Sequence, residues 1–540
     1  MKRYIYILFV LCTVSLGMHA KPARRTAIRL TQPDGTQVTA YLHGDAYYHY
    51  YTTPEGQMLQ RDAKGYYQAT RMPSAEELQV RRNISPRRVA MQKQDGIKLN
   101  LAPRGLIILV NFADLTFQTS AAEIDSMING QHYTRTYSYR TQTGMVRVSS
   151  SGSARQYFHD TSYGKYNPTF DVMGPVTLSH NYSYYGANNA NDEDKNPEAM
   201  IKEACQLVDD EVDFSIYDNN GDGYVDFVYV IYAGYGESDG AGDDYIWPHN
   251  YNLWTYSRVN CTVDGLKVDS YACSNELDYF SDKHDGIGTF CHEFSHVLGL
   301  PDLYSTNNGT HKTMGMWDIL DYGPYNNEGN TPPHYSAYER FFMGWLKPTV
   351  INQACDIELP AMPKANAAAL LTATGTHNLV GNNPSPATFY LLENRQKEGW
   401  DKYLPGSGML ITKISFSQSK WEGNTVNNTR YAMGVDLIEA DGKTPAYSEN
   451  NPDNGYAGKA GDAYPAGSDS FTEIEAFQVT DIQEADGVIY FKVNGGGEQI
   501  LLSAEETMMP TAERTKKVFR NGQILIEHNG IYYDLLGNMH

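Results

Sequence analysis

Two histidines and one glutamate occur together in the stretch "HEFSHVLGLPD", which runs from His292 to Asp302. On a helix, residues four apart lie on the same face, so His292 and His296 can direct imidazole nitrogens at one metal ion. Glu293 is the next residue along the chain and can reach a water on that metal without being a ligand itself. The spacing therefore predicts two zinc ligands and a general base for hydrolysis.

Asp302 is the candidate for the third ligand of this site. Gly299 can adopt the left-handed conformation that ends a helix and turns the chain back. Leu300 and Pro301 then lead to Asp302, whose carboxylate can return to the same ion. The expected site has two imidazoles, one carboxylate and a water, whose pKa zinc would lower towards about 7. Two unrelated histidines on a surface helix are the alternative.

The motif and several other stretches resemble a known family. HExxHxxGxxD followed by Leu303 and Tyr304 is similar to the M6 family of zinc peptidases, the immune inhibitor A-like metalloproteases, which are secreted relatives of the metzincins. By this resemblance the same three ligands and the same base would act on peptide bonds. The other matching stretches are "GSARQYFHDTSYGKY", "FDVMGPV", "DNNGDGYVDFVYVIYAGYGE", "IWPHN", "MGMWDILDYG", "AYERFFMGWLKP" and "LLENRQKEGWDKYLPGSGML".

One position departs from the family. Proteases of this kind place a methionine in a tight turn beneath the zinc, in a W-D-x-M pattern, and here the pattern "WDIL" ends in Leu320. That methionine packs and does not ligate, and Leu for Met usually costs under about 1.5 kcal/mol, so the site is expected to survive. Tyr322 matches a tyrosine that can stabilise the oxyanion of the tetrahedral intermediate in related proteases. An ordinary turn tyrosine is the alternative.

The stretch "DNNGDGYVD" is a second candidate metal site. Its residues at calcium-loop spacing are Asp218, Asn220, Asp222, Tyr224 and Asp226. The bidentate glutamate expected at the twelfth position is replaced by Tyr229, so the loop is not an EF-hand. The secreted context and the resemblance favour calcium, and a polar Asx-turn is the alternative. Carboxylates that could complete the loop are Glu237, Asp239, Asp243 and Asp244.

The elements around the zinc motif must bring its residues together. Residues 286–299 are predicted to form the helix that carries both histidines. Apolar runs at residues 105–114 and from residue 223 predict buried strands, and residues 196–210 predict a helix with an asparagine cap and a first-turn proline. Strands and helices thus alternate, which predicts an α/β (α+β) catalytic domain over residues 96–350. The resemblance implies that this domain is metzincin-like.

The N-terminal part is predicted to be removed in two steps. Residues 1–20 have a positive start, a short apolar run and small residues at the end, which indicates a signal peptide and a secreted or cell-surface protein. Residues 21–95 alternate between polar and apolar, which predicts a small antiparallel β unit. A basic linker follows, so this block is interpreted as a propeptide, with a permanent domain as the alternative. It contains no cysteine, which leaves a carboxylate or a steric plug to block the zinc.

The pattern changes after residue 350. Short strands separated by Pro, Gly and Asn turns predict a β-sandwich over residues 351–495. The glycine-rich residues 494–499 predict a flexible linker, so residues 496–540 are expected to be a linker and a tail. The tail resembles sorting tails of the type IX secretion pathway, which would make the secretion machinery a partner. A terminal hairpin without a sorting function is the alternative.

Five cysteines follow the signal, so at least one has no partner for a disulfide within the chain. Cys261 and Cys273 flank a short alternating stretch, which is consistent with a disulfide across a hairpin or with two buried thiols.

Charge and composition restrict the function. The net charge of -21 argues against binding nucleic acid or an anionic membrane surface, and no later segment has the length and apolarity of a membrane span. We therefore expect a secreted zinc-dependent endopeptidase that acts on proteins or peptides. The alternatives are an inert surface-binding or adhesive protein that retains a zinc site, and a zinc hydrolase of non-protein substrates.

Overall fold

The computed structural model describes residues 19–46, 48–71, 102–141, 144–189, 193–307, 311–442, 458–503, 516–520, 523–528 and 531–533. The chain divides into two compact units, Met1–Leu502 and Ser503–His540. Apart from its last two residues, the predicted signal peptide lies outside the described residues. None of the helices that are described has the length and apolarity needed to cross a bilayer.

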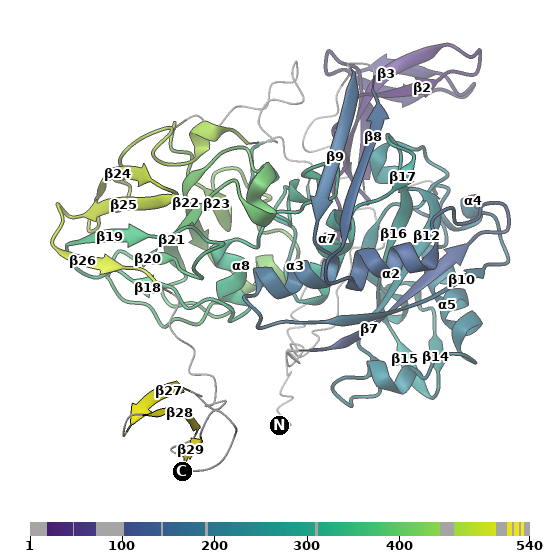
Figure 1. Ribbon diagram of the computed structural model, residues 1–540. Coiled ribbons are helices and arrows are strands. Elements are labelled where there is room, and N and C mark those ends of the chain that lie inside the picture. The colour runs from purple at the N-terminus through teal and green to yellow at the C-terminus, as the bar shows by residue number, and fades with distance from the viewer. Residues whose placement is uncertain are drawn as a thin grey trace, which may run out of the picture. The chain divides into compact units, whose positions relative to one another are not determined.

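The region that contains the zinc motif is built on a seven-stranded mixed sheet (Figure 1). Its order is β1-β13-β16-β12-β7-β10, with β17 beside β16. The four strands from β16 to β10 are parallel, β13 is antiparallel to β16, and the edge strand β1 is antiparallel to β13. The bounds are β1 (His19–Ala20), β7 (Arg104–Asn111), β10 (Thr169–Thr177), β12 (Val228–Tyr235), β13 (His249–Asn252), β16 (Ser270–Asp278) and β17 (Lys283–His284).

Helices cover both faces of this sheet. Side chains alternate along a strand, so Ile107 and Leu109 of β7 join one apolar core while Leu106 and Ile108 join the other. The first core contains residues of α2 (Ala121–Asn129), α3 (Ala154–Thr161) and α7 (Ile287–Val297), and the second contains those of α5 (Pro197–Val208). Burial on both faces explains why the sequence of β7 is a continuous apolar run. The predicted mixed α/β fold is confirmed.

The N-terminal block is a five-stranded antiparallel meander, drawn in purple in Figure 1. Its strands are β2 (Ile28–Thr31), β3 (Gln37–Asp45), β4 (Tyr48–Thr52), β5 (Met58–Arg61) and β6 (Tyr67–Thr70). Two smaller sheets flank the central region: the hairpin of β8 (Thr134–Arg140) and β9 (Met145–Ser151), and the sheet of β11 (Tyr224–Val225), β14 (Cys261–Val263) and β15 (Leu266–Val268).

Two sheets follow residue 348 and bury side chains in one shared apolar core. This arrangement agrees with the expected β-rich block, and the sandwich assignment stays a prediction. The first sheet contains β18 (Thr349–Val350), β20 (Ala369–Leu371), β21 (Thr388–Arg395), β22 (Gly408–Ser415) and β23 (Val435–Leu437). The second contains β24 (Val479–Ala485), β25 (Val488–Val493), β19 (Cys355–Leu359) and β26 (Glu498–Leu501). Two short helices, α8 (Ala337–Phe342) and α9 (Gln418–Glu422), accompany them.

The expected linker at residues 494–499 is a tight turn. Gly495 and Gly496 have positive φ angles of 85° and 89°, and the chain then enters β26, which pairs with β19. The glycines therefore allow a sharp turn and not a flexible connection. The second unit contains the antiparallel strands β27 (Lys516–Arg520), β28 (Gln523–His528) and β29 (Ile531–Tyr533).

The disulfide considered between Cys261 and Cys273 does not form. All five cysteines that the structure describes are free thiols. Cys261 lies opposite Val268 in a small sheet, and its thiol is hydrogen-bonded to that of Cys205. Cys273 lies in the main sheet, opposite Val230. The two residues belong to different sheets, a separation that their short distance in sequence does not reveal.

Candidate metal centre

Helix α7 carries the zinc motif and is buried along its whole length. Its first turn approaches a neighbouring backbone so closely that a Cβ on Gly288 would lie 2.1 Å from the carbonyl oxygen of Pro324. Glycine is therefore required there. Gly299, just past the C-terminal end of the helix, has a φ of +86°, so it turns the chain in the left-handed conformation that the sequence predicted.

The ligand atoms of His292, His296 and Asp302 converge. The two Nε2 atoms are 3.2 Å apart, and Oδ1 of Asp302 is 3.3 Å from Nε2 of His292 and 3.4 Å from Nε2 of His296. Ligand atoms about 2.0–2.1 Å from a tetrahedral zinc ion are separated from one another by about 3.3 Å. The spacing of the three atoms therefore fits zinc.

The backbone determines which nitrogen of each imidazole faces the centre. Nδ1 of His292 lies 2.7 Å from the carbonyl oxygen of Ile319, and Nδ1 of His296 lies 2.8 Å from that of Leu300. A carbonyl only accepts, so each Nδ1 donates, which leaves Nε2 of each imidazole to supply the lone pair that a metal would bind. Two lone pairs and a carboxylate repel one another at these distances unless a cation lies between them. The donor set thus fits zinc in its chemistry as well.

Asn424 holds the third candidate ligand and was not predicted from the sequence. Its side-chain Nδ2 donates to Oδ2 of Asp302 at 2.7 Å, and its Oδ1 accepts from the backbone N–H of Asp302 at 2.8 Å. Asn424 follows α9 and has a φ of +49°, a conformation that asparagine tolerates better than most residues. It lies 122 residues from its partner, so neither spacing nor periodicity could point to it.

The turn that contains Leu320 supports the site through its backbone. The carbonyl oxygen of Leu320 accepts from the N–H of Leu303 at 2.7 Å, and that of Ile319 holds His292. The Leu320 side chain is fully buried in the apolar core that also contains residues of α7. A leucine can fill this place because the position requires apolar volume and not a ligand atom.

Glu293 has the environment of a general base beside the three ligands. Its side chain is fully buried, and burial raises the pKa of its carboxyl to about 8. Oε1 accepts a hydrogen bond from the backbone N–H of Lys21 at 2.9 Å. Among the described atoms, Oε2 has no hydrogen-bond partner.

An N-terminal segment, Ala20 to Arg25, lies across this site. Its first residue belongs to β1, which pairs antiparallel with the edge strand β13. The carbonyl oxygen of Lys21 accepts from Nε1 of Trp247 at 2.8 Å, and that of Pro22 accepts from the hydroxyl of Tyr325 at 2.6 Å. The segment is thus held through its backbone, as an added strand would be.

Two tyrosines contact this segment at different points. The Tyr304 hydroxyl donates to the carbonyl oxygen of Ala20 at 2.5 Å, one residue before the amide that reaches Glu293. The hydroxyl of Tyr322, the residue predicted for the oxyanion, accepts from Nε of Arg25 at 2.8 Å. Tyr304 was noted in the sequence only as part of the family pattern, yet it is the hydroxyl beside the carbonyl.

The predicted calcium loop folds as a polar turn. Asp218 accepts from the backbone N–H groups of Asp222 and Gly223, both at 3.0 Å. Asp222 accepts from the N–H of Tyr224 at 2.9 Å, and Asp226 accepts two bonds from one asparagine of the same loop. These are the bonds that the Asx-turn alternative requires.

Two of the carboxylates expected to complete this loop have partners elsewhere. Glu237 accepts from Nδ2 of Asn188 at 2.7 Å, and Asp239 pairs with Lys21. Within the described residues, the group of His, Cys, Asp or Glu side chains close enough to hold a metal lies at the zinc motif, around His292, Glu293 and His296, and not in this loop. Calcium therefore stays a prediction.

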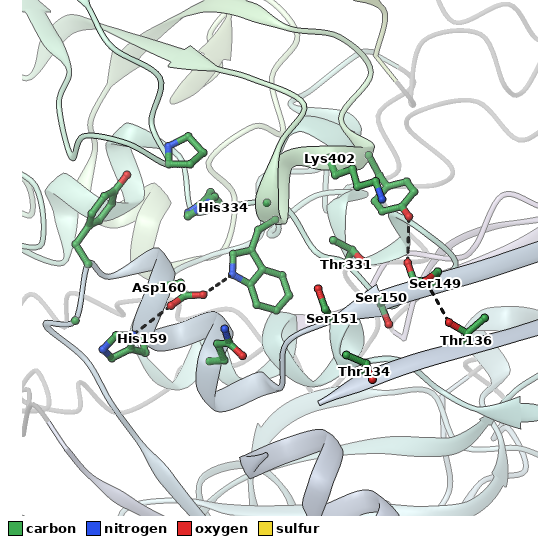
Figure 2. Close-up of a pocket in the computed structure, with 17 residues that line it drawn as sticks. Thr134, Thr136, Ser149, Ser150, Ser151, His159, Asp160, Thr331, His334 and Lys402 are labelled. Carbon is green, nitrogen blue, oxygen red and sulfur yellow. Dashed lines mark hydrogen bonds and ion pairs between the residues drawn. The ribbon is translucent and has the colours of Figure 1, made fainter. Parts of the chain in front are cut away.

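A separate hollow of about 630 Å³ lies between the β8–β9 hairpin, α3 and the 3-10 helix η6 (Gly399–Tyr403) (Figure 2). Trp400 donates to Asp160 at 3.1 Å, and the hydroxyl of Tyr403 donates to the carbonyl oxygen of Ser149 at 3.1 Å. Its lining contains neither the zinc-motif histidines nor Asp302. We interpret it as part of the contact between the central and C-terminal regions.

The Asn424 contact predicts a measurable effect on the metal. We expect Asn424→Gly, which removes the amide but accepts the positive φ, to weaken zinc binding by about 10–100-fold because Asp302 loses its orienting partner. Competition with a chromogenic chelator measures this affinity. The exposed Asn382→Gly is the matched control, and equal zinc affinity in the two variants would contradict the assigned role.

Comparisons with known proteins match part of this chain to a metallopeptidase family. Residues 100–346 match the family model for the immune inhibitor A peptidase M6 catalytic domain. This range of the chain includes all three candidate ligands. Immune inhibitor A of Bacillus thuringiensis subsp. alesti is 28% identical over 269 residues, 44% of this chain and 39% of that protein. Pre-pro-metalloprotease PrtV of Vibrio cholerae serotype O1 (strain M66-2) is 30% identical over 214 residues, 35% of this chain and 23% of that protein. The match thus spans less than half the length of either relative, and it shows that residues 100–346 are similar to the M6 peptidase catalytic domain.

Proposed function

We propose that this protein is a zinc-dependent endopeptidase that hydrolyses peptide bonds in proteins. The observation that carries the proposal is a peptide amide, the N–H of Lys21, held 2.9 Å from Glu293 Oε1 beside three converging ligand atoms. A hydrolase of small non-protein substrates would not need an edge strand that pairs with a peptide. An inert adhesive protein would not need a buried glutamate next to the ligands.

Each group would have a distinct role. His292, His296 and Asp302 would hold zinc, which when bound polarises the carbonyl of the cleaved bond and acidifies water. Glu293 would accept a proton from the attacking water and deliver it to the leaving amine. The N–H of Lys21 marks the place of that amine, because it already contacts the Glu293 carboxylate.

The substrate would bind as an extended strand. β1 is the outermost strand of the main sheet and covers β13. The two strands pair in antiparallel register, with His19 opposite Asn250 and Ala20 opposite His249. A substrate on the same edge would direct its carbonyl at Tyr304 and its amide at Glu293, as the segment does. Main-chain pairing of this kind is compatible with many protein sequences.

The same contacts support latency. A substrate cannot enter while Lys21 and the residues after it occupy the groove, so residues 21–95 would act as a propeptide that must withdraw or be cut. Ala20 ends the proposed signal peptide, so it would lie in the groove only until that peptide is removed. The described segment meets Glu293 and Tyr304 through backbone groups. This favours a steric plug over a carboxylate as the block. Export through residues 1–20 and sorting through the C-terminal tail belong to the same proposal.

Removing the base tests the mechanism. We expect Glu293→Ala to lower casein cleavage by at least about a hundredfold, because general acid–base catalysis is lost, while zinc content stays near that of the wild type. A casein zymogram with and without 1,10-phenanthroline and metal analysis of the purified protein measure both. The exposed Glu484→Ala is the control, and casein cleavage by Glu293→Ala at the wild-type rate would refute the proposal.

The two tyrosines are distinguished by matched substitutions. We expect Tyr304→Phe to lower kcat by about 10²–10³-fold, because the hydroxyl nearest the carbonyl is lost, with a much smaller effect of Tyr322→Phe. Steady-state kinetics on one peptide substrate measures both. A larger loss from Tyr322→Phe would return the oxyanion role to the residue that the sequence predicted.

A further inference from the structure

The side chain of Lys21 fills a buried acidic pocket next to the metal centre. It is 1% exposed, and its Nζ lies 3.1 Å from Oγ1 of Thr289 and 3.4 Å from Oδ1 of Asp239. The ammonium also lies over the ring of Tyr325, 4.8 Å from its centroid. A carboxylate, a hydroxyl and an aromatic face together form a site for a cation.

The pocket is built into the elements that form the metal centre. Thr289 belongs to α7, less than one turn before His292, and its hydroxyl donates to Oδ2 of Asp285 at 2.9 Å. Burial raises the pKa of Asp285 to about 6, and the nearby Lys21 ammonium lowers it. Asp239 is 2% exposed. A carboxylate so deeply buried is costly unless a cation is paired with it.

The register of the segment assigns this pocket to one substrate position. The backbone N–H of Lys21 contacts Glu293, and the carbonyl of the preceding residue contacts Tyr304. In the proposed reaction, these are the amide and the carbonyl of the cleaved bond. The pocket therefore receives the side chain of the residue immediately after that bond, the P1′ residue.

We propose that the enzyme cleaves on the amino side of lysine or arginine, whose side chain enters the pocket formed by Asp239, Asp285, Thr289 and Tyr325. The inference rests on the proposed peptidase function and adds its substrate class. When the N-terminal segment withdraws, Asp239 loses the ammonium that pairs with it. A basic P1′ side chain replaces that partner, an alanine leaves the carboxylate unpaired, and a glutamate adds a second negative charge beside it.

The groove continues to favour basic residues beyond this pocket. Three residues after Lys21, the guanidinium of Arg24 is paired with Asp278 and Glu328 and lies 4.6 Å from the centroid of the Phe280 ring. Arg24 is 8% exposed, so this contact is also largely enclosed. The part of the groove that would bind residues after the cleaved bond thus has two acidic subsites. They are spaced for the first and the fourth of these residues.

Mapping fragment ends tests the inference without any substitution. The full chain is first incubated until its casein-cleaving activity no longer rises. It then digests casein, and mass spectrometry identifies the new N-termini of the fragments. We expect lysine and arginine to be enriched at least about tenfold at the first residue of the fragments. If casein is cleaved with no such enrichment, the inference is overturned and the peptidase proposal stays intact. The pocket would then serve only to anchor the N-terminal segment. An absence of zinc-dependent cleavage overturns both.

Matched peptides and one substitution locate the cause. Peptides that differ only in the P1′ residue (Lys, Ala or Glu) are compared by kcat/KM for wild type and Asp239→Asn. We expect the ratio of kcat/KM for the Lys peptide to kcat/KM for the Ala peptide to fall at least about tenfold in Asp239→Asn. Asp486→Asn, on the exposed β24–β25 turn, is the charge-matched control. An unchanged preference in Asp239→Asn overturns the assignment; if that variant does not fold, the wild-type order of the three peptides decides.

Discussion

The mutual repulsion of three buried electron-pair donors is the constraint on which this structure depends. Nε2 of His292, Nε2 of His296 and Oδ1 of Asp302 lie within 3.4 Å of one another in a site from which water is largely excluded. Without a cation such a cluster is unfavourable, so the surrounding fold must hold the three groups in place. Their close approach fits the donor set that a divalent metal requires.

Much of the architecture serves to hold these three groups. The carbonyls of Ile319 and Leu300 orient the imidazoles, and the first of them comes from the turn that ends at Leu320. Asn424 comes from the C-terminal region and orients the carboxylate. The C-terminal β block therefore contributes a contact to the candidate metal centre. The central and C-terminal regions also share one apolar core, which contains residues of α7, β21 and β22.

In the proposed function, the N-terminal segment marks the path that a peptide substrate would follow through the same site. Its backbone pairs with the edge strand β13 and reaches Glu293, while its first basic side chain enters the acidic pocket. Main-chain contacts of this type are independent of sequence, whereas the buried Asp239 is selective for charge. Binding by the backbone and selection by one side chain thus act at adjacent points of a single groove.

Local spacing and long-range contacts differ in what a sequence reveals. The i, i+4 relation of His292 and His296 and the left-handed Gly299 depend on neighbours along one helix, so the motif could be predicted. Asn424 and Lys21 meet the site only through tertiary folding, 122 and 272 residues from their partners, and no periodicity marks them. The turn glycines near residue 495 were mistaken for a linker because composition does not distinguish a tight turn from a flexible chain.

The claim that these three side chains form a zinc centre is tested most directly by X-ray diffraction from crystals of the full chain at energies above and below the zinc absorption edge. The account predicts one strong anomalous peak about 2.0–2.1 Å from Nε2 of His292, Nε2 of His296 and a carboxylate oxygen of Asp302. A zinc-replete crystal with no peak between these three atoms would contradict it.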